Sequence, residues 1–342
     1  MQQESQGIVP VGPPADNPEI QRGNWSALPA DDPVVEYLAA NHWDRPERPA
    51  SWVVARFSRA AYVYRETSSQ WTVVAKFYAI KTGTSAQKHA EQEFEWIQQA
   101  QAAGLAEGDV RAIRPLALWR GVLFLEYVDG LTLEDIVAVR RSRPGTLSEG
   151  LERAAAALAK LHAHGIHHDL QPDFPPKIAY TNRIVGDLVK HGVLQDDPGT
   201  GDGLIRLINR WATNPLMEDF VPTLNHGDAT TTNFVFPWNG GVVVIDWERL
   251  ELADPAADLG RLMAEVDHSI KQHGGSAAEA VPAIQYLVDA YSRALPSGWD
   301  SDVIFERARF YRASSTLRIA RNGWVSRLDR TALVAQAMGL LS

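Results

Sequence analysis

The polar residues best suited to chemistry lie in one stretch, Leu224 to Leu259, which reads LNHGDATTTNFVFPWNGGVVVIDWERLELADPAADL. Its two apolar runs are preceded by Asp228 and Asn233 and followed by Asp246. Carboxylate and amide oxygens are the ligands that Mg²⁺ prefers, and a carboxylate that does not hold a metal can act as a base. These residue types therefore suit magnesium-assisted phosphoryl transfer.

A short hairpin is predicted to bring these residues together. The runs FVF and VVVI flank an Asn239-Gly240-Gly241 turn, which is a strong hairpin signal. Asp228 and Asn233 precede the first strand, and Asp246 ends the second. Because the open ends of a hairpin lie side by side, we expect all three residues at one place.

Composition narrows the classes of protein. The chain has 342 residues, 45% of them hydrophobic, which is enough for two lobes. The net charge of −9 argues against a nucleic-acid partner and is compatible with a cationic substrate, although acidity for solubility explains it equally well. With no cysteine, disulfides, thiolate ligands and a Cys nucleophile are excluded.

No targeting or membrane segment is expected from the sequence. The first residues lack a cationic segment followed by an apolar one, and no apolar run is long enough to span a bilayer. We therefore expect a cytoplasmic protein without a membrane partner. No pattern predicts an oligomeric interface.

The segment before the chemical stretch predicts a small lobe. Residues 1–33 are rich in Pro, Gly, Gln and Asp, and are predicted to form a flexible arm. Residues 34–129 are expected to hold a short helix, a five-stranded antiparallel sheet and a longer helix. The strands are expected at 51–57, 61–67, 71–78, 115–119 and 122–128, and the long helix at 85–103, with Gly104 ending it.

Lys76 interrupts the apolar strand VVAKFY of this lobe. Taken alone, such a lysine most simply extends its charged end to solvent. Glu91, Glu93 and Glu95 lie on the following helix. If one of these glutamates faces Lys76, a functional role for the lysine is favoured over simple exposure to solvent.

Residues 130–342 predict a mostly helical second lobe, so the fold class is α+β and bilobal. Thr132 and Asp135 form a capping-box pattern at its first helix, where a hinge between lobes is expected. A weakly patterned insert, 174–222, separates this part from the chemical stretch. The remaining helices are expected at 148–163, 177–189, 203–212, 257–273, 277–294, 301–322 and 326–341.

The motifs together resemble the aminoglycoside phosphotransferase and choline kinase family of the protein-kinase-like superfamily. NHGDATTTNFVF resembles its catalytic loop, VVVIDWE its metal-binding strand end, and DPAADLGRL the segment that follows. VVAKFY is similar to its lysine-bearing strand and LFLEYVDG to its hinge strand. The layout resembles the family from about Ser51 to Leu341.

The resemblance implies a role for each matching residue. Asp228 would be the catalytic base, and Asn233 and Asp246 would hold Mg²⁺ on the triphosphate. Lys76 would bind the α- and β-phosphates, supported by Glu93, with Glu91 as the alternative.

Further residues would bind the nucleotide or support the loop. The backbone of Glu126, Tyr127 and Val128 would contact adenine, and Ser58 and Arg59 the phosphates, although no glycine-rich loop is present there. The resemblance also implies that His226 and Asp258 are structural supports. ATP is the expected nucleotide, with GTP as the alternative.

A second loop competes for the catalytic role. GIHHDLQPD (165–173) resembles a protein-kinase catalytic loop around Asp169, but the residue five positions later is Phe174 rather than Asn. No apolar strand ending in a metal-binding Asp follows, so Asp228 is preferred. The histidines of this region are interpreted first as residues of a helix end, because cationic His is favoured at helix C-termini. A position at the mouth of the acceptor pocket is preferred to a metal site. These residues are His162, His164, His167 and His168.

The sequence thus predicts an ATP-dependent kinase that phosphorylates a hydroxyl of an aminoglycoside or related sugar. The acceptor is expected between the catalytic loop, the 174–222 insert and the C-terminal helices. A choline-like alcohol kinase and a non-catalytic nucleotide-binding module are the alternatives. A protein kinase is disfavoured because the segment between Asp246 and Asp258 is too short for an activation loop.

Overall fold

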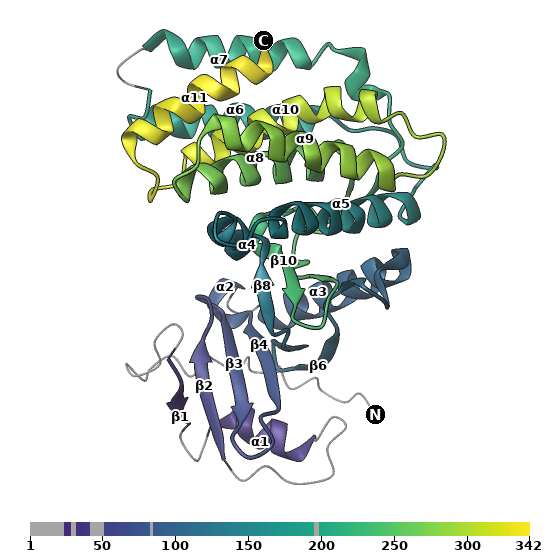
Figure 1. Cartoon of the computed structure of the whole chain (residues 1–342), viewed down its shortest axis with the longest axis vertical. Coiled ribbons are helices and arrows are strands. Elements are labelled where there is room, and N and C mark those ends of the chain that lie inside the picture. Colours follow the sequence, from purple (N-terminus) through teal and green to yellow (C-terminus); the bar gives the residue numbers. More distant parts are fainter. Residues whose placement is uncertain (1–23, 29–31, 42–50, 83–84, 195–197) are drawn as a thin grey trace, which may run out of the picture. The chain divides into compact units, whose positions relative to one another are not determined.

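The structure, a computed structural model, describes residues 24–28, 32–41, 51–82, 85–194 and 198–342. The predicted flexible arm therefore lies largely outside the described residues. The chain divides into two compact units (Figure 1). Unit 1 comprises Met1–Gln99 and Ile113–Asp129, and unit 2 comprises Ala100–Ala112 and Gly130–Ser342.

Unit 1 contains a six-stranded antiparallel sheet in the order β1-β2-β3-β4-β7-β6. All five predicted strands are present. The additional strand, β1, pairs with β2 at the edge and is too short to show an alternating pattern in the sequence. The bounds are β1 Ser26–Ala27, β2 Trp52–Arg56, β3 Ala61–Glu66, β4 Thr72–Phe77, β6 Pro115–Trp119 and β7 Val122–Glu126.

A short helix, α1 (Pro33–Ala40), packs against this sheet. The Asp32 side chain caps it by accepting a hydrogen bond from the backbone N–H of Val34 at 2.9 Å. Val34 and Leu38, one turn apart, are buried with the apolar residues of β2, β3, β4 and β7. This packing gives unit 1 a core of its own.

Two helices follow β4 in the chain, α2 (Ala79–Thr82) and α3 (Ala86–Ala100). A π-helical turn, η2 (Gln101–Leu105), continues α3, and Gly104, the predicted end of the helix, has a φ of +92°. This turn belongs to unit 2, where it packs against α5 (Thr146–His164). The helix predicted at 85–103 is therefore shared between the two units.

Unit 2 is mostly helical, as predicted. α10 packs against both α8 and α11, and α5 packs against α9 (Figure 1). The two helices of the insert begin earlier than predicted, each at a proline, which is favoured in a first helical turn. The bounds are α4 Leu133–Val139, α6 Pro175–Lys190, α7 Pro198–Trp211, α8 Ala256–Gln272, α9 Ala277–Ala294, α10 Ser301–Ala320 and α11 Arg327–Leu341.

Short strands in unit 2 form two small sheets, with orders β5-β11-β10-β8 and β12-β9. Of these strands, only the β10–β11 hairpin was predicted, because the others pair with distant parts of the chain. The bounds are β5 Val110–Ala112, β8 Gly130–Thr132, β9 Thr223–Asn225, β10 Phe234–Pro237, β11 Val242–Val244 and β12 Glu251–Ala253. The 3₁₀ turns η3 (Pro215–Glu218) and η4 (Thr231–Asn233) flank β9 in the chain.

The register of the β10–β11 hairpin positions the polar residues at its open end. Phe234 pairs with Val244, and the backbone N–H of Ile245 donates to the carbonyl of Asn233 at 3.0 Å. Asn233 and Ile245 are thus direct neighbours across the two strands, and Asp246 follows immediately. A shift by one residue would turn each strand's buried face outward.

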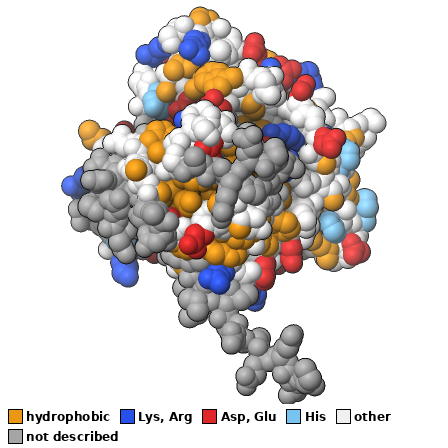
Figure 2. Space-filling view, turned by 90° about the horizontal axis from the view of Figure 1, so that it is seen from below, with side chains coloured by type: hydrophobic (Ala, Val, Ile, Leu, Met, Phe, Trp, Pro, Cys, Tyr) orange, Lys and Arg blue, Asp and Glu red, His pale blue; other side chains and the backbone are white. Residues whose placement is uncertain are grey.

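The described surface is mixed in character. Figure 2 shows a face on which acidic and basic side chains are interspersed among hydrophobic ones, a pattern typical of a solvated surface. None of the described helices has the length and apolar character that crossing a membrane requires.

Candidate active site

Gly227 allows the loop after β9 to pass close to a neighbouring segment. The loop His226-Gly227-Asp228 follows directly after β9. Gly227 has a φ of +74°, and a Cβ there would lie 1.9 Å from the carbonyl oxygen of Arg249. Both the backbone conformation and the contact therefore require glycine, and this explains the glycine between His226 and Asp228.

His226 holds the loop against the hairpin. Its Nε2 lies 2.9 Å from the carbonyl of Ile245, and its Nδ1 accepts a hydrogen bond from the backbone N–H of Asp228 at 3.2 Å. This pattern needs a neutral ring with the proton on Nε2. The buried ring also packs on Trp247, with 4.6 Å between centroids. Both nitrogens are engaged, so the geometry gives His226 a structural part.

Asp258 braces the same loop from within unit 2. Its carboxylate accepts from the backbone N–H of His226 at 2.6 Å and of Gly227 at 2.9 Å, and it lies 3.4 Å from His162 Nε2. Burial would raise the pKa of Asp258, but His162 and the backbone hydrogen bond more than offset this, so that the pKa is lowered. Asp258 is therefore an ionised, buried anchor for the loop.

Replacing this anchor should destabilise the protein in a pH-dependent way. Asp258→Ala leaves two buried N–H groups without an acceptor, and we expect the free energy of unfolding to fall by about 3 kcal/mol. Because the folded pKa is depressed, this contribution is fully present above the unfolded pKa of about 3.9 and is lost as pH falls below it.

Urea unfolding of the wild type and Asp258→Ala at pH 7, 5 and 3.5 measures this difference. It should be the same at the two higher values and smaller at the lowest. A difference below about 1 kcal/mol at pH 7 would contradict the role of an anchor.

Asn233 and Asp246 both line one small cavity. The cavity has a volume of about 250 Å³ and is also lined by Asp228, Thr230 and Thr232. The Asn233 amide nitrogen donates to the carbonyl of Asp228 at 2.9 Å, so the amide oxygen is the atom of this side chain that could coordinate a metal. This set of hard oxygen donors fits Mg²⁺.

Asp246 adopts a backbone conformation that is uncommon for residues with a side chain. Its φ is +64°, and the only other described non-glycine residues with positive φ are Gln70 and Arg120. Left-handed backbone is tolerated best by Asn, Asp and Gly, and strained residues concentrate at functional sites. The turn after β11 thus imposes a conformation suited to the aspartate.

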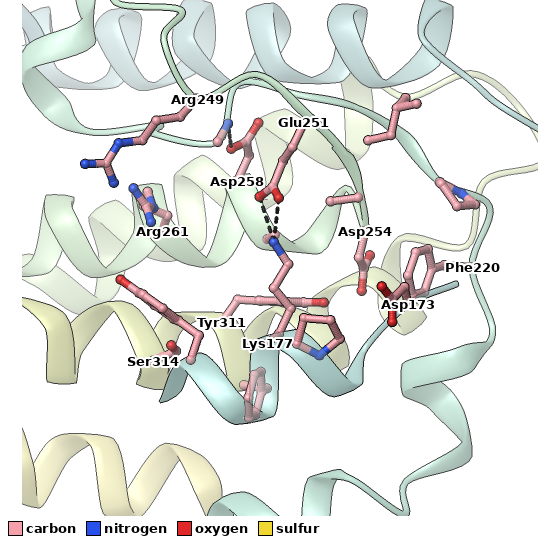
Figure 3. Close-up of a pocket in the computed structure, with 18 of the residues that line it drawn as sticks. Asp173, Lys177, Phe220, Arg249, Glu251, Asp254, Asp258, Arg261, Tyr311 and Ser314 are labelled. Atoms are coloured by element: carbon pink, nitrogen blue, oxygen red, sulfur yellow. Dashed lines mark hydrogen bonds and ion pairs between the residues drawn. The ribbon is translucent and has the colours of Figure 1, made fainter. Parts of the chain in front are cut away.

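Asp228 lines this small cavity, and its ion-pair partner Arg261 lines a larger one. The larger cavity, about 600 Å³, is lined by the neighbouring Gly227 and by residues from β12, α6, α8 and α10 (Figure 3). Arg318 lines both cavities. A carboxylate in this position can take a proton from a hydroxyl in the larger cavity that faces a phosphate in the smaller one.

Two arginines contact Asp228 that the sequence had not indicated. Arg261 forms an ion pair with Asp228 Oδ1, and Arg249 Nε lies 3.7 Å from Oδ2. Arg261 follows Asp258 by three positions on α8 and so shares its helix face. That spacing is the signal that could have identified Arg261.

In unit 1, Lys76 and Glu93 form a buried ion pair. Lys76 Nζ lies 2.7 Å from Glu93 Oε2, and the Glu93 side chain is 1% exposed. Glu91 instead accepts a hydrogen bond from Gln87 at 2.8 Å and is exposed. Of the two glutamates considered, Glu93 is therefore the partner of the lysine.

The other predicted nucleotide contacts also lie in unit 1. Ser58 Oγ accepts from the backbone N–H of Ala61 at 3.1 Å in the β2–β3 turn, and Arg59 is exposed beside it. The turn amide is thus held by a serine hydroxyl rather than presented by glycines. Tyr127 and Val128 follow Glu126, the last residue of β7, where the sheet pairing ends.

The loop around Asp169 (165–173) and the histidines near it make structural contacts. Ile166 forms an isolated bridge with Thr223, so the loop packs on the strand that precedes Asp228. His162 is buried and its Nδ1 lies 2.7 Å from the Tyr291 hydroxyl, while the His164 Nδ1 lies 2.8 Å from the Lys160 carbonyl. Asp169 is exposed. These histidines are thus used in helix packing.

Comparison with known proteins identifies the family. A model of the phosphotransferase enzyme family matches residues 55–301. Among curated proteins, none matches the chain.

Solved structures share the fold. One is the ternary complex of APH(2'')-IIa with streptomycin and ATP, at 15% identity and a TM-score of 0.56, covering 90% of this chain and 97% of that one. Another is spectinomycin phosphotransferase with ADP and spectinomycin, at 14% identity and a TM-score of 0.53, with coverages of 90% and 96%.

A third is the Plasmodium vivax ethanolamine kinase, at 14% identity and a TM-score of 0.51, covering 85% of this chain and 78% of that one. Likeness at these identities concerns the fold, whereas the family match spans most of the chain. The chain therefore belongs to the phosphotransferase enzyme family.

Proposed function

We propose that the protein transfers the γ-phosphate of ATP to a hydroxyl of a sugar or amino sugar, with Asp228 as the base. The observation that carries this proposal is that Asp228 lines one cavity while its neighbour Gly227 and its ion-pair partner Arg261 line a second. One is lined by the metal-binding oxygens of Asn233 and Asp246, and the other has room for a small molecule. The same arrangement would serve any alcohol acceptor, so a choline-like acceptor is the alternative.

The chemical step moves one proton and one phosphoryl group. The acceptor O–H bond breaks as its proton passes to the Asp228 carboxylate, and the acceptor oxygen bonds to the γ-phosphorus. The bond from that phosphorus to the bridging oxygen breaks, and ADP leaves. Mg²⁺ held by Asn233 and Asp246 would offset the negative charge on the phosphate oxygens.

Residues of unit 1 would bind the rest of the nucleotide. We assign Lys76 to the α- and β-phosphates, with Glu93 fixing its ammonium group, and the backbone of Glu126, Tyr127 and Val128 to the base. Ser58 and Arg59 are assigned to the phosphates. An ion pair with a carboxylate favours the charged form of a buried lysine, as this role requires.

Removing the Lys76 charge should weaken nucleotide binding, and it should also lower the stability of the fold because buried Glu93 loses its lysine. Lys76→Met keeps the length of the side chain, and we expect the KM for ATP to rise by about 10- to 100-fold, which corresponds to one charge-assisted contact. Lys88→Met, which removes an exposed lysine from α3, is the matched control. Equal effects of the two variants would rule out a phosphate contact by Lys76.

A screen for acceptor-dependent ATP consumption tests the function. Sugars, amino sugars, aminoglycosides and amino alcohols are offered with ATP or GTP and Mg²⁺, and product phosphorylation is followed by mass spectrometry. Turnover that disappears on adding EDTA supports the kinase. Magnesium-dependent nucleotide binding without turnover of any acceptor would favour the non-catalytic alternative.

A further inference from the structure

Most acidic residues of the larger cavity are already engaged. Asp254 pairs with Arg307 at 2.9 Å, Glu251 with Lys177 at 2.7 Å, and Asp258 holds the catalytic loop. Asp173 is the fourth acid in the lining and lies at the end away from Arg249 and Arg261 (Figure 3). A polycationic acceptor would therefore meet few free carboxylates near the reacting hydroxyl.

Three arginines gather at the opposite end of the cavity. Arg249, Arg261 and Arg318 gather around the carboxylates of Asp228 and Glu265. Arg318 is paired with Glu265 and Arg261 with Asp228. The close approach of Arg318 and Arg261 is reflected in the Arg318 pKa, which burial and the Arg261 charge lower. Of the three arginines, Arg249 is the one without an ion pair at hydrogen-bond distance.

Arg249 is the cation with the most capacity for a ligand. Its side chain is 52% exposed, against 15% for Arg261, and its contact with Asp228, at 3.7 Å, is longer than a hydrogen bond. A guanidinium offers five N–H donors, and it binds carboxylate or phosphate in a bidentate manner. Within the described residues, no shorter acidic contact to Arg249 is present.

The placement of Arg249 and Arg261 distinguishes an acceptor contact from a nucleotide contact. Both arginines line the larger cavity, and neither lines the smaller one with Asn233 and Asp246. Figure 3 shows the two guanidinium groups at the same end of the cavity, opposite Asp173 and Phe220. A ligand group that reaches them would come from the acceptor side.

We propose that Arg249, together with Arg261, binds an anionic group of the acceptor, so that the substrate is a hydroxyl compound bearing a carboxylate or phosphate, such as a sugar acid. This inference rests on the proposed function, since it names the acceptor class for the same site. Asp228 competes with the acceptor's anion for the two arginines. Binding of the anion would release Asp228 oxygens from Arg261 and make them accessible to the acceptor hydroxyl.

Because Asp228 competes with the acceptor's anion for the arginines, the inference predicts in which direction a substitution at Asp228 changes ligand affinity. Binding of D-glucuronate, D-glucose 6-phosphate, D-glucose and D-glucosamine is measured by calorimetry without nucleotide. We expect the two anionic sugars to bind more tightly than glucose and glucosamine. Asp228→Asn should tighten binding of the anionic sugars by several-fold, because it removes the competing charge, whereas a cationic ligand would bind more weakly.

Arginine variants identify the contact. Arg249→Ala should weaken binding of the anionic sugars by about 10- to 100-fold and leave glucose within about threefold. Arg249→Lys should restore part of the loss. Arg206→Ala, which removes an exposed arginine from α7 outside the cavity, is the control and should change neither.

The outcomes separate this inference from the proposed function. Preference for glucosamine, no binding of either anionic sugar, or an equal loss for all four sugars in Arg249→Ala would overturn the anion site. Acceptor-dependent ATP turnover in those circumstances would leave the kinase intact. Tight, Arg249-dependent binding of an anionic sugar supports the site even if the proposed kinase reaction fails.

Discussion

Asp228→Asn is expected to lower acceptor-dependent turnover at least about a thousandfold while nucleotide affinity changes by less than about threefold. The substitution keeps the size of the side chain and an oxygen for Arg261, but removes the group that takes the hydroxyl proton. General-base catalysis contributes about 10²- to 10⁴-fold, and loss of the positioning charge adds to it. Steady-state kinetics and nucleotide titration measure the two quantities separately.

The rival loop supplies the matched control for this variant. Asp169→Asn makes the same chemical change at an exposed aspartate in the other kinase-like sequence. It should retain nearly full activity. If Asp169→Asn abolished turnover and Asp228→Asn did not, the assignment of the catalytic loop would be wrong.

Features set by local sequence were predicted well. The β10–β11 hairpin was correct because a glycine-rich turn fixes its register within a few residues. The C-terminal helices were found within a few residues of their ends since their apolar periodicity is strong. Strands β5, β8, β9 and β12 were missed, because each is three residues long and stabilised by pairing with a distant segment.

In the candidate site too, residues within local motifs were predicted, whereas residues brought together by the fold were not. The family motifs pointed to Asp228, Asn233 and Asp246, which the structure brings to the lining of one cavity. The arginines around Asp228 were missed because their significance depends on the fold. Arg249 reaches the carboxylate from the segment between β11 and β12, and Arg261 from the first turns of α8. No single sequence motif marks two arginines that reach one carboxylate from different segments, although the Asp258–Arg261 spacing was visible in the sequence.

The position of the arginines also changes the expectation for the acceptor. The net charge of the whole chain suggested a cationic substrate, but net charge is a sum over the surface. Specificity depends on the few charges within Coulomb range of the ligand, and the field of more distant surface charges is screened within about 8–10 Å. At Asp228 those nearby charges include two arginines, and the exposed Arg249 has capacity for an anionic ligand.

Asp246→Asn should abolish magnesium-dependent nucleotide binding and lower turnover by at least about a thousandfold. A metal ion supplies several kcal/mol of charge stabilisation in the transition state, and every 1.36 kcal/mol is a factor of ten in rate. Asparagine is the informative replacement because it tolerates the left-handed φ of +64° as aspartate does. The backbone turn is therefore preserved while the carboxylate is lost.

Nucleotide affinity measured with and without Mg²⁺ separates a metal role from a structural one. The wild type should bind ATP more tightly when Mg²⁺ is present, and Asp246→Asn should bind equally weakly in both conditions. Its thermal unfolding without ligand should match the wild type within about 2 °C, because Asn keeps the size of the side chain and the turn. A variant that unfolds early, or one that keeps the magnesium dependence, would argue that Asp246 shapes the turn after β11 and that other oxygens hold the metal.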